Sequence, residues 1–247
     1  GHQVRVLSRN PAKLPDQWRD RVKVAVGDAT DEADVRAALA GADVVYYLLH
    51  SMDGGGDFVA RDRALAQQFA RLAAEAGTGR IVYLSGLHPK GELSEHLASR
   101  VEVGEILLGS GVPTAVLQAG VVLGAGSASF DMLRHLTERL PAMVAPKWLE
   151  NHIQPIAVKD AVFYLVAAAE LPPEVNRTFD LGGPDVLTYR EMMQRYAGLA
   201  GLIPRAVVTV PVLTPNLASY WVGLVTPIKS GIARPLVGSL MHDAVRD

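Results

Sequence analysis

The chain opens on Gly1-His2-Gln3-Val4-Arg5-Val6-Leu7-Ser8-Arg9-Asn10, and this stretch decides the fold. Val4, Val6 and Leu7 predict a short apolar strand, which residues 8–11 close with hydrogen-bonding and turn residues. No glycine-rich turn precedes this strand, and the first residue is Gly rather than Met. We therefore expect a fragment of a longer protein, with this segment as the second strand of an α/β sheet whose first strand is missing.

Strands and helices then alternate, with short connections, to about residue 123. Such alternation builds a parallel sheet that helices cover on both faces. Further strands are predicted at 22–26, 43–49, 80–84 and 114–117, and helices at 31–39, 58–76 and 94–108. Segment 43–49 is almost wholly apolar, which predicts a strand buried on both faces. The fold class expected is α/β, a Rossmann-like doubly wound parallel sheet.

The pattern changes beyond Gly124. Thr188-x-x-Glu191 matches a capping box. Helices are predicted at 127–140, 159–170 and 188–199, and strands at 155–158 and 178–181. We expect residues 1–123 to form a nucleotide-binding domain truncated at its N-terminus, and residues 124–247 to form a small substrate-side lobe interleaved with the core.

Composition excludes several classes of protein. Of 247 residues, 49% are hydrophobic and 20% charged, which suits a buried core and argues against disorder. The formal net charge of −2, scattered along the chain, argues against a nucleic-acid partner. There is no cysteine, which fits a reducing cytoplasm. No histidine arrangement suggests a metal site, and no G-x-S-x-G elbow suggests a serine hydrolase.

Membrane contact is a minor alternative for the C-terminal segment. No run reaches the roughly 18–20 uninterrupted apolar residues of a membrane span. Segment 207–240 comes closest, but four prolines interrupt it. A cap packed on the main domain is favoured over a segment lying on a membrane surface.

Arg9 is the most specific indication in the sequence of which cofactor is bound. At the carboxyl end of this strand in a doubly wound fold, an acidic residue favours NAD, whereas an arginine accommodates the 2′-phosphate of NADP. A guanidinium binds phosphate bidentately and stays charged. Ser8 and Asn10 could donate to the same phosphate. The sequence thus favours NADP over NAD; an exposed arginine at a strand end is the alternative.

Two further candidate cofactor-binding segments, with weaker support, follow other predicted strands. Gly27-Asp28-Ala29 could meet the adenine edge, although aspartate is also common in turns and helix caps. His50 and Ser51 follow strand 43–49, where ligands bind outside the carboxyl ends of strands. They are candidates for contact with the pyrophosphate and the nicotinamide ribose.

Ser85, His96 and Arg100 form the candidate catalytic group. Ser85 ends a strand, and positions 96 and 100 share one face of the following helix. A serine, a proton donor and a cation in one crevice could polarise a carbonyl and anchor a ribose. The alternative is that His96 and Arg100 are polar residues of a solvent-exposed helix face, among neighbouring glutamates, without a catalytic role.

Four motifs carry a family resemblance: G-H-x-V-R-x-L-x-R-N-P, G-D-A-T-D, R-I-V-Y-L-S-G-L and Q-P-I-A-V-K-D-A-V. Their order and spacing resemble the NmrA-like, atypical or extended short-chain dehydrogenases/reductases over nearly the whole chain. Bacterial NAD(P)H-binding proteins of this group are most similar, and they often carry an additional C-terminal domain. A related branch is the accessory nucleotide-binding subunit of respiratory complex I.

The resemblance assigns roles residue by residue. It implies that Arg9 lies at the 2′-phosphate, that Asp28 and Ala29 lie at the adenine, and that Ser85 occupies the catalytic-serine position. It also implies that Leu48, Leu49 and His50 lie along the middle of the cofactor. At the nicotinamide, it implies contacts from Gln118, Ala119 and Gly120. The family's Y-x-x-x-K pair is replaced here by His96 and Arg100. Arg100 could still hold the ribose.

The resulting expectation is an NADP-dependent oxidoreductase that acts on a small organic carbonyl or enone. The alternative is a non-catalytic NADP-binding redox sensor or assembly subunit, which the replaced pair favours. Sugar-nucleotide epimerisation ranks lower for the same reason. Because the missing first strand is the central one in this topology, we expect two sheet halves without their shared neighbour and weak NADP binding.

Overall fold

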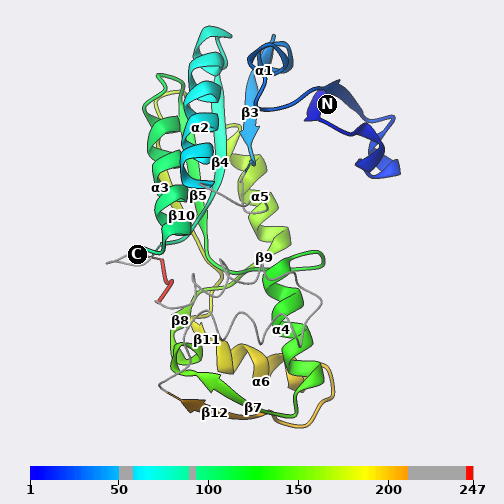
Figure 1. Ribbon diagram of the computed structural model, residues 1–247, viewed down its shortest axis with the longest axis vertical. Helices are drawn as coiled ribbons and strands as arrows, with labels where there is room; N and C mark the ends of the chain where they lie inside the picture. The colour runs from blue at the N-terminus through cyan, green and yellow to red at the C-terminus, as the bar shows by residue number, and fades with distance from the viewer. Residues whose placement is uncertain (50–57, 89–92, 211–242, 247) are drawn as a thin grey trace.

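The computed structural model describes residues 1–49, 58–88, 93–210 and 243–246. Its largest sheet has four parallel strands in the order β10-β5-β4-β3 (Figure 1). These strands are β3 (Val44–Tyr47), β4 (Arg80–Gly86), β5 (Thr114–Ala119) and β10 (Arg177–Leu181). All four were predicted from the sequence to within a few residues at their ends.

Helices cover both faces of this sheet. On one face, Ile81, Tyr83 and Val116 pack in one apolar cluster with α2 (Phe58–Glu75) and α3 (Glu95–Leu108). On the other face, Val82, Ala115 and Leu117 pack against α5 (Val158–Ala168). Successive residues of a strand point to opposite faces, which accounts for the two separate clusters. The predicted α/β class, with a doubly wound parallel sheet, is confirmed.

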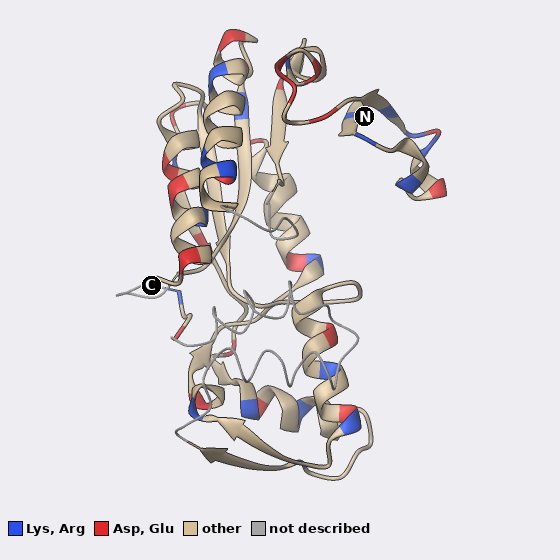
Figure 2. Cartoon of the chain, viewed as in Figure 1, with Lys and Arg blue, Asp and Glu red and all other residues tan. Residues whose placement is uncertain are grey.

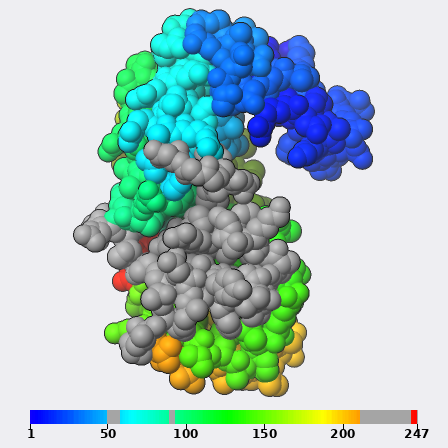
Figure 3. Space-filling model, in the orientation of Figure 1, coloured from blue at the N-terminus to red at the C-terminus, as the bar shows by residue number. Residues whose placement is uncertain are grey.

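The first two strands form a separate sheet. β1 (Val4–Ser8) pairs in parallel with β2 (Val22–Val26), from Val4 opposite Val22 to Ser8 opposite Val26. Figures 1 and 3 show this amino-terminal part, in dark blue, standing away from the rest of the chain. Within the described residues, β1 and β3 each pair with a single neighbour. The sheet therefore has two halves.

One prediction about β3 is wrong. Segment 43–49 was expected to be buried on both faces, yet β3 is an edge strand and Tyr46 is 42% exposed. Its sequence is that of a central strand, but none of the described strands pairs with its outer edge.

Helix α1 (Glu32–Leu39) attaches the small sheet to the main body. Asp31 caps α1 by accepting hydrogen bonds from the N–H groups of Ala33 and Asp34. The Arg5 guanidinium of β1 donates to the carbonyls of Ala38 and Ala40, each at 2.8 Å, near the end of α1. Through these contacts, α1 connects the sheet of β1 and β2 to the main body.

A four-residue ionic cluster joins α1 to α2. Arg36 contacts Glu32 at 3.1 Å and Glu75 at 2.7 Å, and Arg71 contacts the same carboxylates at 2.7 and 3.0 Å. Figure 2 shows acidic and basic residues interspersed over these helices. The hydrogen bonds from Arg71 and Arg36 hold the pKa values of Glu32 and Glu75 below their ordinary value of 4.5.

The cluster gives a pH-dependent prediction. A carboxyl whose pKa is lowered by folding adds stability above its unfolded pKa, and this stability is lost as the pH falls through the folded pKa. We expect Glu32→Gln to lower the Tm at pH 7 and to leave it unchanged at pH 2. Asp16→Asn is the matched control, because Asp16 is exposed and pairs with Arg19, three residues away in the same turn. A Tm difference that persists at pH 2 would contradict an electrostatic origin.

The remaining elements form a smaller lobe. Strand β7 (Ala142–Pro146) pairs in parallel with β12 (Ala206–Val210), and α4 (Ala128–Arg139) packs against α6 (Tyr189–Leu199). Thr188 and Glu191 form the predicted capping box at the start of α6. The strands β7 and β12 were not predicted. Two short pairings complete the fold: β6 (Val122–Leu123) with β9 (Ile156–Ala157), and β8 (His152–Ile153) with β11 (Leu187–Thr188).

Across the part of the chain that the structure describes, no helix combines the length and apolar character that a membrane span requires.

Candidate functional site at the carboxyl ends of the strands

Arg9 directly follows β1 and extends into solvent. Its side chain is 79% exposed, and one guanidinium nitrogen lies 3.7 Å from a carboxylate oxygen of Asp28, just past β2. Asp28 accepts hydrogen bonds from the backbone and hydroxyl of Thr30, both at 2.9 Å. These bonds, with a smaller contribution from Arg9, lower the pKa of Asp28. Arg9 therefore keeps most of its guanidinium free for an anionic ligand.

The neighbours of Arg9 make local contacts. Ser8 Oγ accepts the N–H of Asn10 at 3.3 Å, and Asn10 Oδ1 accepts the N–H of Ala12 at 3.1 Å, which opens a 3-10 turn. These bonds leave the Ser8 hydroxyl hydrogen and the Asn10 amide N–H groups able to donate. The Ala29 carbonyl accepts from Gln68 of α2 at 3.2 Å.

Arg100 connects the ends of two neighbouring strands. From α3 its guanidinium donates to the carbonyl of Leu49, after β3, at 3.2 Å and to that of Leu84, in β4, at 2.7 Å. Its Cζ atom lies 5.0 Å from the centre of the Tyr83 ring. Leu48 and Leu49 have exposed side chains at the same place. Arg100 thus fixes backbone at the edge where ligands bind in open α/β sheets.

Ser85 lies beside this arginine. Its hydroxyl is 3.4 Å from the Arg100 carbonyl, which also accepts from the Tyr83 hydroxyl at 3.3 Å. Burial raises the pKa of Tyr83, although Arg100 opposes the shift, so this phenol stays neutral near pH 7. Sequence reasoning missed Tyr83. Its position two residues before Ser85, on the same face of the strand, could have indicated it.

His96 lies in the first turn of α3, which Ser94 caps by accepting the N–H of Leu97 at 3.3 Å. It is half-buried, one turn before Arg100. His50, the other candidate histidine, lies outside the described residues, as does Ser51.

The end of β5 supplies the last candidates. Gln118 is buried and aligned with Ser85 in the pairing of β4 with β5, and Ala119 is aligned with Gly86. Gly120 follows, and a Cβ atom there would lie 3.5 Å from the carbonyl oxygen of Gln154. Ser85 and Gln118 therefore lie on neighbouring strand ends that Arg100 of α3 approaches, whereas Arg9 and Asp28 follow the strands of the separate two-stranded sheet.

Gln154 was not among the predicted site residues, although the Q-P-I-A-V motif contains it. It is almost fully buried, donates to the Gly183 carbonyl at 2.6 Å and accepts the N–H of Arg246 at 3.2 Å. Gly182 is needed here, because a Cβ atom would come within 2.7 Å of the Gln154 side chain. Gln154 thereby connects three segments next to the end of β5.

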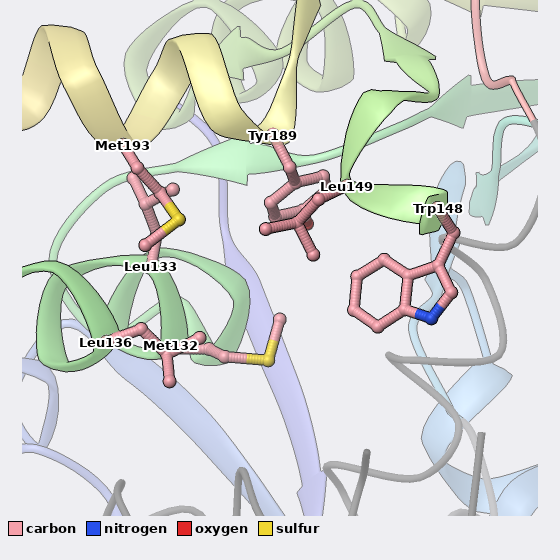
Figure 4. A pocket seen from close by; sticks show the side chains of 7 residues that line it. All are labelled: Met132, Leu133, Leu136, Trp148, Leu149, Tyr189 and Met193. Carbon is pink, nitrogen blue, oxygen red and sulfur yellow. The ribbon is translucent and has the colours of Figure 1, made fainter. Parts of the chain in front are cut away.

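The smaller lobe contains an apolar cavity of about 20 Å³, enough for about one water molecule. Figure 4 shows its lining: Met132, Leu133 and Leu136 of α4, Trp148 and Leu149 before β8, and Tyr189 and Met193 of α6. The Tyr189 hydroxyl is buried and has no hydrogen-bond partner among the residues that the structure describes, and burial raises its pKa.

This hydroxyl allows a stability prediction. A buried polar group without a partner carries an uncompensated desolvation cost. We expect Tyr189→Phe to raise the free energy of unfolding by about 1 kcal/mol. Tyr196→Phe is the matched control and should lower it, because the Tyr196 hydroxyl donates to Glu138 at 2.6 Å. Chemical denaturation measures both, and destabilisation by Tyr189→Phe would show that its hydroxyl is bonded.

The comparisons with known proteins agree with this architecture. Residues 1–108 match a family model described as NAD(P)H-binding. This segment runs from β1 to the end of α3 and includes Arg9, Asp28, Ser85 and Arg100. This part of the chain is therefore similar to that family. No curated protein sequence matches the chain.

Three solved structures share the fold over almost the whole chain. A nucleoside-diphosphate-sugar epimerase from Staphylococcus aureus has a TM-score of 0.75 at 15% identity, with 98% of this chain and 82% of that chain covered. The Citrobacter sp. triphenylmethane reductase complexed with NADP(H) has a TM-score of 0.74 at 17% identity, with 99% and 83% covered. The NADPH-dependent quinone oxidoreductase from Escherichia coli complexed with NADPH has a TM-score of 0.70 at 20% identity, with 98% and 82% covered.

These identities establish a common fold. Together with the match of residues 1–108 to the NAD(P)H-binding family model, this fold agrees with the resemblance to the NmrA-like, atypical short-chain dehydrogenases/reductases that the sequence motifs carry.

Proposed function

We propose that the protein is an NADP-dependent oxidoreductase that transfers hydride between NADPH and a small organic carbonyl or enone. The observation that carries the proposal is the geometry of the strand ends within a chain that matches an NAD(P)H-binding family. There Arg100 joins the ends of β3 and β4 beside Ser85, while Arg9 presents an exposed cation after β1. Two of the structural neighbours were solved with NADP(H) or NADPH.

The residues fit the phosphorylated cofactor better than its unphosphorylated form. Arg9 is exposed, and within the described part of the chain its guanidinium is restrained by a 3.7 Å contact to Asp28, so it can turn to a 2′-phosphate without breaking a tight ion pair. In this proposal Ser8 and Asn10 add donors at the same phosphate. Asp28 and Ala29 border the adenine, and Leu48 and Leu49 border the middle of the dinucleotide.

The catalytic roles follow from the same arrangement. When bound, the nicotinamide supplies the hydride to the substrate carbon. In this proposal the Ser85 hydroxyl turns from the Arg100 carbonyl to donate to the substrate oxygen, and His96 supplies the proton that this oxygen takes up. A carbonyl substrate then gives the alcohol, and an enone gives the enol, which tautomerises to the saturated ketone. Arg100 holds the strand ends and faces the ribose, with Gln118, Ala119 and Gly120 beside the nicotinamide. Residues 1–123 with α5 and β10 form the cofactor part, and the rest of 124–247 the substrate-side lobe.

Replacing Ser85 tests the catalytic role. We expect Ser85→Ala to lower kcat by about 100-fold, the range found when one positioned hydrogen-bond donor is lost. The dissociation constant for NADPH should stay within about threefold, because the hydroxyl acts on the substrate. NADPH oxidation against ketones, enones and quinones measures kcat, and Thr209→Ala, on β12 of the other lobe, is the matched control. Unchanged turnover in Ser85→Ala would remove Ser85 from the chemistry.

A non-catalytic NADP-binding sensor or assembly subunit is the second candidate. One observation favours it: the Arg100 guanidinium already donates to two backbone carbonyls, in a chain without the Tyr-x-x-x-Lys pair. The same substrate panel separates the two functions. Tight NADPH binding without turnover of any substrate would support the sensor and reject the oxidoreductase.

A further inference from the structure

A larger cavity, of about 270 Å³, lies between α5 and the edge strand β10. Helix α5 packs mainly over β4 and β5, and the cavity forms between this helix and the outer strand. Leu117, Phe179 and Leu181 line its sheet side, and Ala168 and Leu171 line the side of the helix. The volume is close to the lower end of ligand pockets, which span roughly 300–1,000 Å³.

The cavity lies on the opposite face of the sheet from the candidate catalytic serine. Ser85 of β4 is aligned with Gln118 of β5, and both alternate along their strands with residues that pack toward α5. Leu117, directly before Gln118, is one of those residues and forms part of the cavity wall. The cavity is therefore a site separate from the one that contains Ser85.

Arg246 brings a positive charge to the cavity. Its backbone N–H donates to the Gln154 side chain at 3.2 Å, and Gln154 in turn donates to the Gly183 carbonyl at 2.6 Å, just after β10. The backbone of Arg246 is thereby held beside the end of this strand. Its side chain is exposed and borders the cavity, and no carboxylate among the described residues pairs with its guanidinium.

Asp180 also borders the cavity, but its carboxylate does not cancel this charge. It lies between Phe179 and Leu181 in β10, and both of those side chains pack toward α5. Because side chains alternate along a strand, the carboxylate of Asp180 points to the other face of the sheet. Among the described residues, the lining thus combines apolar walls with a single charged group that faces the cavity, the Arg246 guanidinium.

We propose that this cavity binds a small organic carboxylate whose body is apolar, either aromatic or branched aliphatic. The apolar body fills the space between Leu117, Leu171 and Phe179, where its burial removes apolar surface from water. The carboxylate pairs with the Arg246 guanidinium, whose planar donors match two carboxylate oxygens. A fully hydrated anion such as free phosphate is disfavoured, because it would lose water against the apolar walls without gaining partners there. The inference goes beyond the proposed function, since neither the cofactor nor hydride transfer requires this cavity.

Calorimetric titration of the protein with 4-isopropylbenzoate, at pH 7 and fixed ionic strength, tests the site. The matched neutral probe is 4-isopropylbenzamide, which has nearly the same shape. We expect the carboxylate to bind at least about tenfold more tightly than the amide, because it alone makes the charge-assisted contact. Arg246→Gln should remove this difference, while it keeps the backbone N–H that bonds to Gln154. Arg177→Gln is the charge control, because Arg177 lies over the Phe179 ring but outside the cavity lining.

A second pair of variants tests the cavity wall. Ala167 borders the cavity at an exposed position of α5, so Ala167→Glu places a like charge beside the bound carboxylate. We expect it to weaken binding of 4-isopropylbenzoate by at least about fivefold. Val166→Glu is the matched control, because it adds the same charge at the preceding position, which is 57% exposed and not part of the lining.

Three results would overturn the proposal. One is the absence of saturable binding of 4-isopropylbenzoate up to its solubility limit. Another is binding that Arg246→Gln and Ala167→Glu leave unchanged, or that Arg177→Gln and Val166→Glu weaken equally, since the probe would then lie elsewhere. The third is competitive displacement of the probe by NADPH, which would assign the probe to the cofactor site.

Discussion

Replacing Arg9 with glutamine is expected to weaken NADPH binding by about 30- to 100-fold while changing NADH binding by less than about threefold. A charge-assisted, bidentate arginine–phosphate contact at a partly exposed site contributes about 2–2.7 kcal/mol, which corresponds to that factor. NADH lacks the 2′-phosphate, so its affinity does not depend on this contact with Arg9. Arg9 is suited to this contact because it is 79% exposed and its carboxylate neighbour, Asp28, is held by Thr30.

The measurement is a titration of both cofactors into the protein at fixed ionic strength, since phosphate contacts weaken with salt. Arg19→Gln is the control, because Arg19 is also exposed but pairs with Asp16 in the turn between β1 and β2. Equal weakening of NADPH and NADH would assign Arg9 a general structural role. If neither changed, the cofactor selectivity would have to come from another cation.

Local patterns in the sequence predicted the local structure well. Thr188 caps α6, and the capping box that the sequence predicts between Thr188 and Glu191 is present. The alternation of strands and helices predicted the doubly wound sheet. These features depend on residues close in sequence, and so a single sequence contains them.

Contacts between distant segments could not be predicted in this way. The pairing of β7 with β12 joins segments about 60 residues apart in a region rich in proline and glycine, where periodicity is weak. The spacing of His96 and Arg100 placed them on one helix face. It could not reveal that Arg100 reaches the carbonyls of Leu49 and Leu84, because that contact depends on how α3 packs against the sheet. The exposure of Tyr46 likewise depends on which strand lies beside β3.

An extended polypeptide, defined as this chain preceded by the residues that its own reading frame encodes, is expected to bind NADPH at least about 100-fold more tightly than the 247-residue chain. This factor corresponds to about 2.7 kcal/mol. Two effects combine. The N-terminus of a crossover helix after a central strand offers backbone N–H groups to a pyrophosphate. A strand paired with both β1 and β3 would also fix Arg9, on the small sheet, relative to Arg100 and Ser85 on the large one. At present α1 and its contacts with α2 are the main connection between those sheets.

Calorimetric titration of the two polypeptides measures this difference, and adenosine 2′,5′-bisphosphate provides the matched control ligand. It has the adenine and the 2′-phosphate but no pyrophosphate or nicotinamide, so it needs only the end of the small sheet around Arg9 and Asp28. We expect it to bind both polypeptides within about fivefold, because that local geometry is already present in the shorter chain. Equal NADPH affinities would mean that the gap between β1 and β3 does not limit binding. A bisphosphate that binds only the extended polypeptide would mean that the small sheet itself is shaped by the added segment.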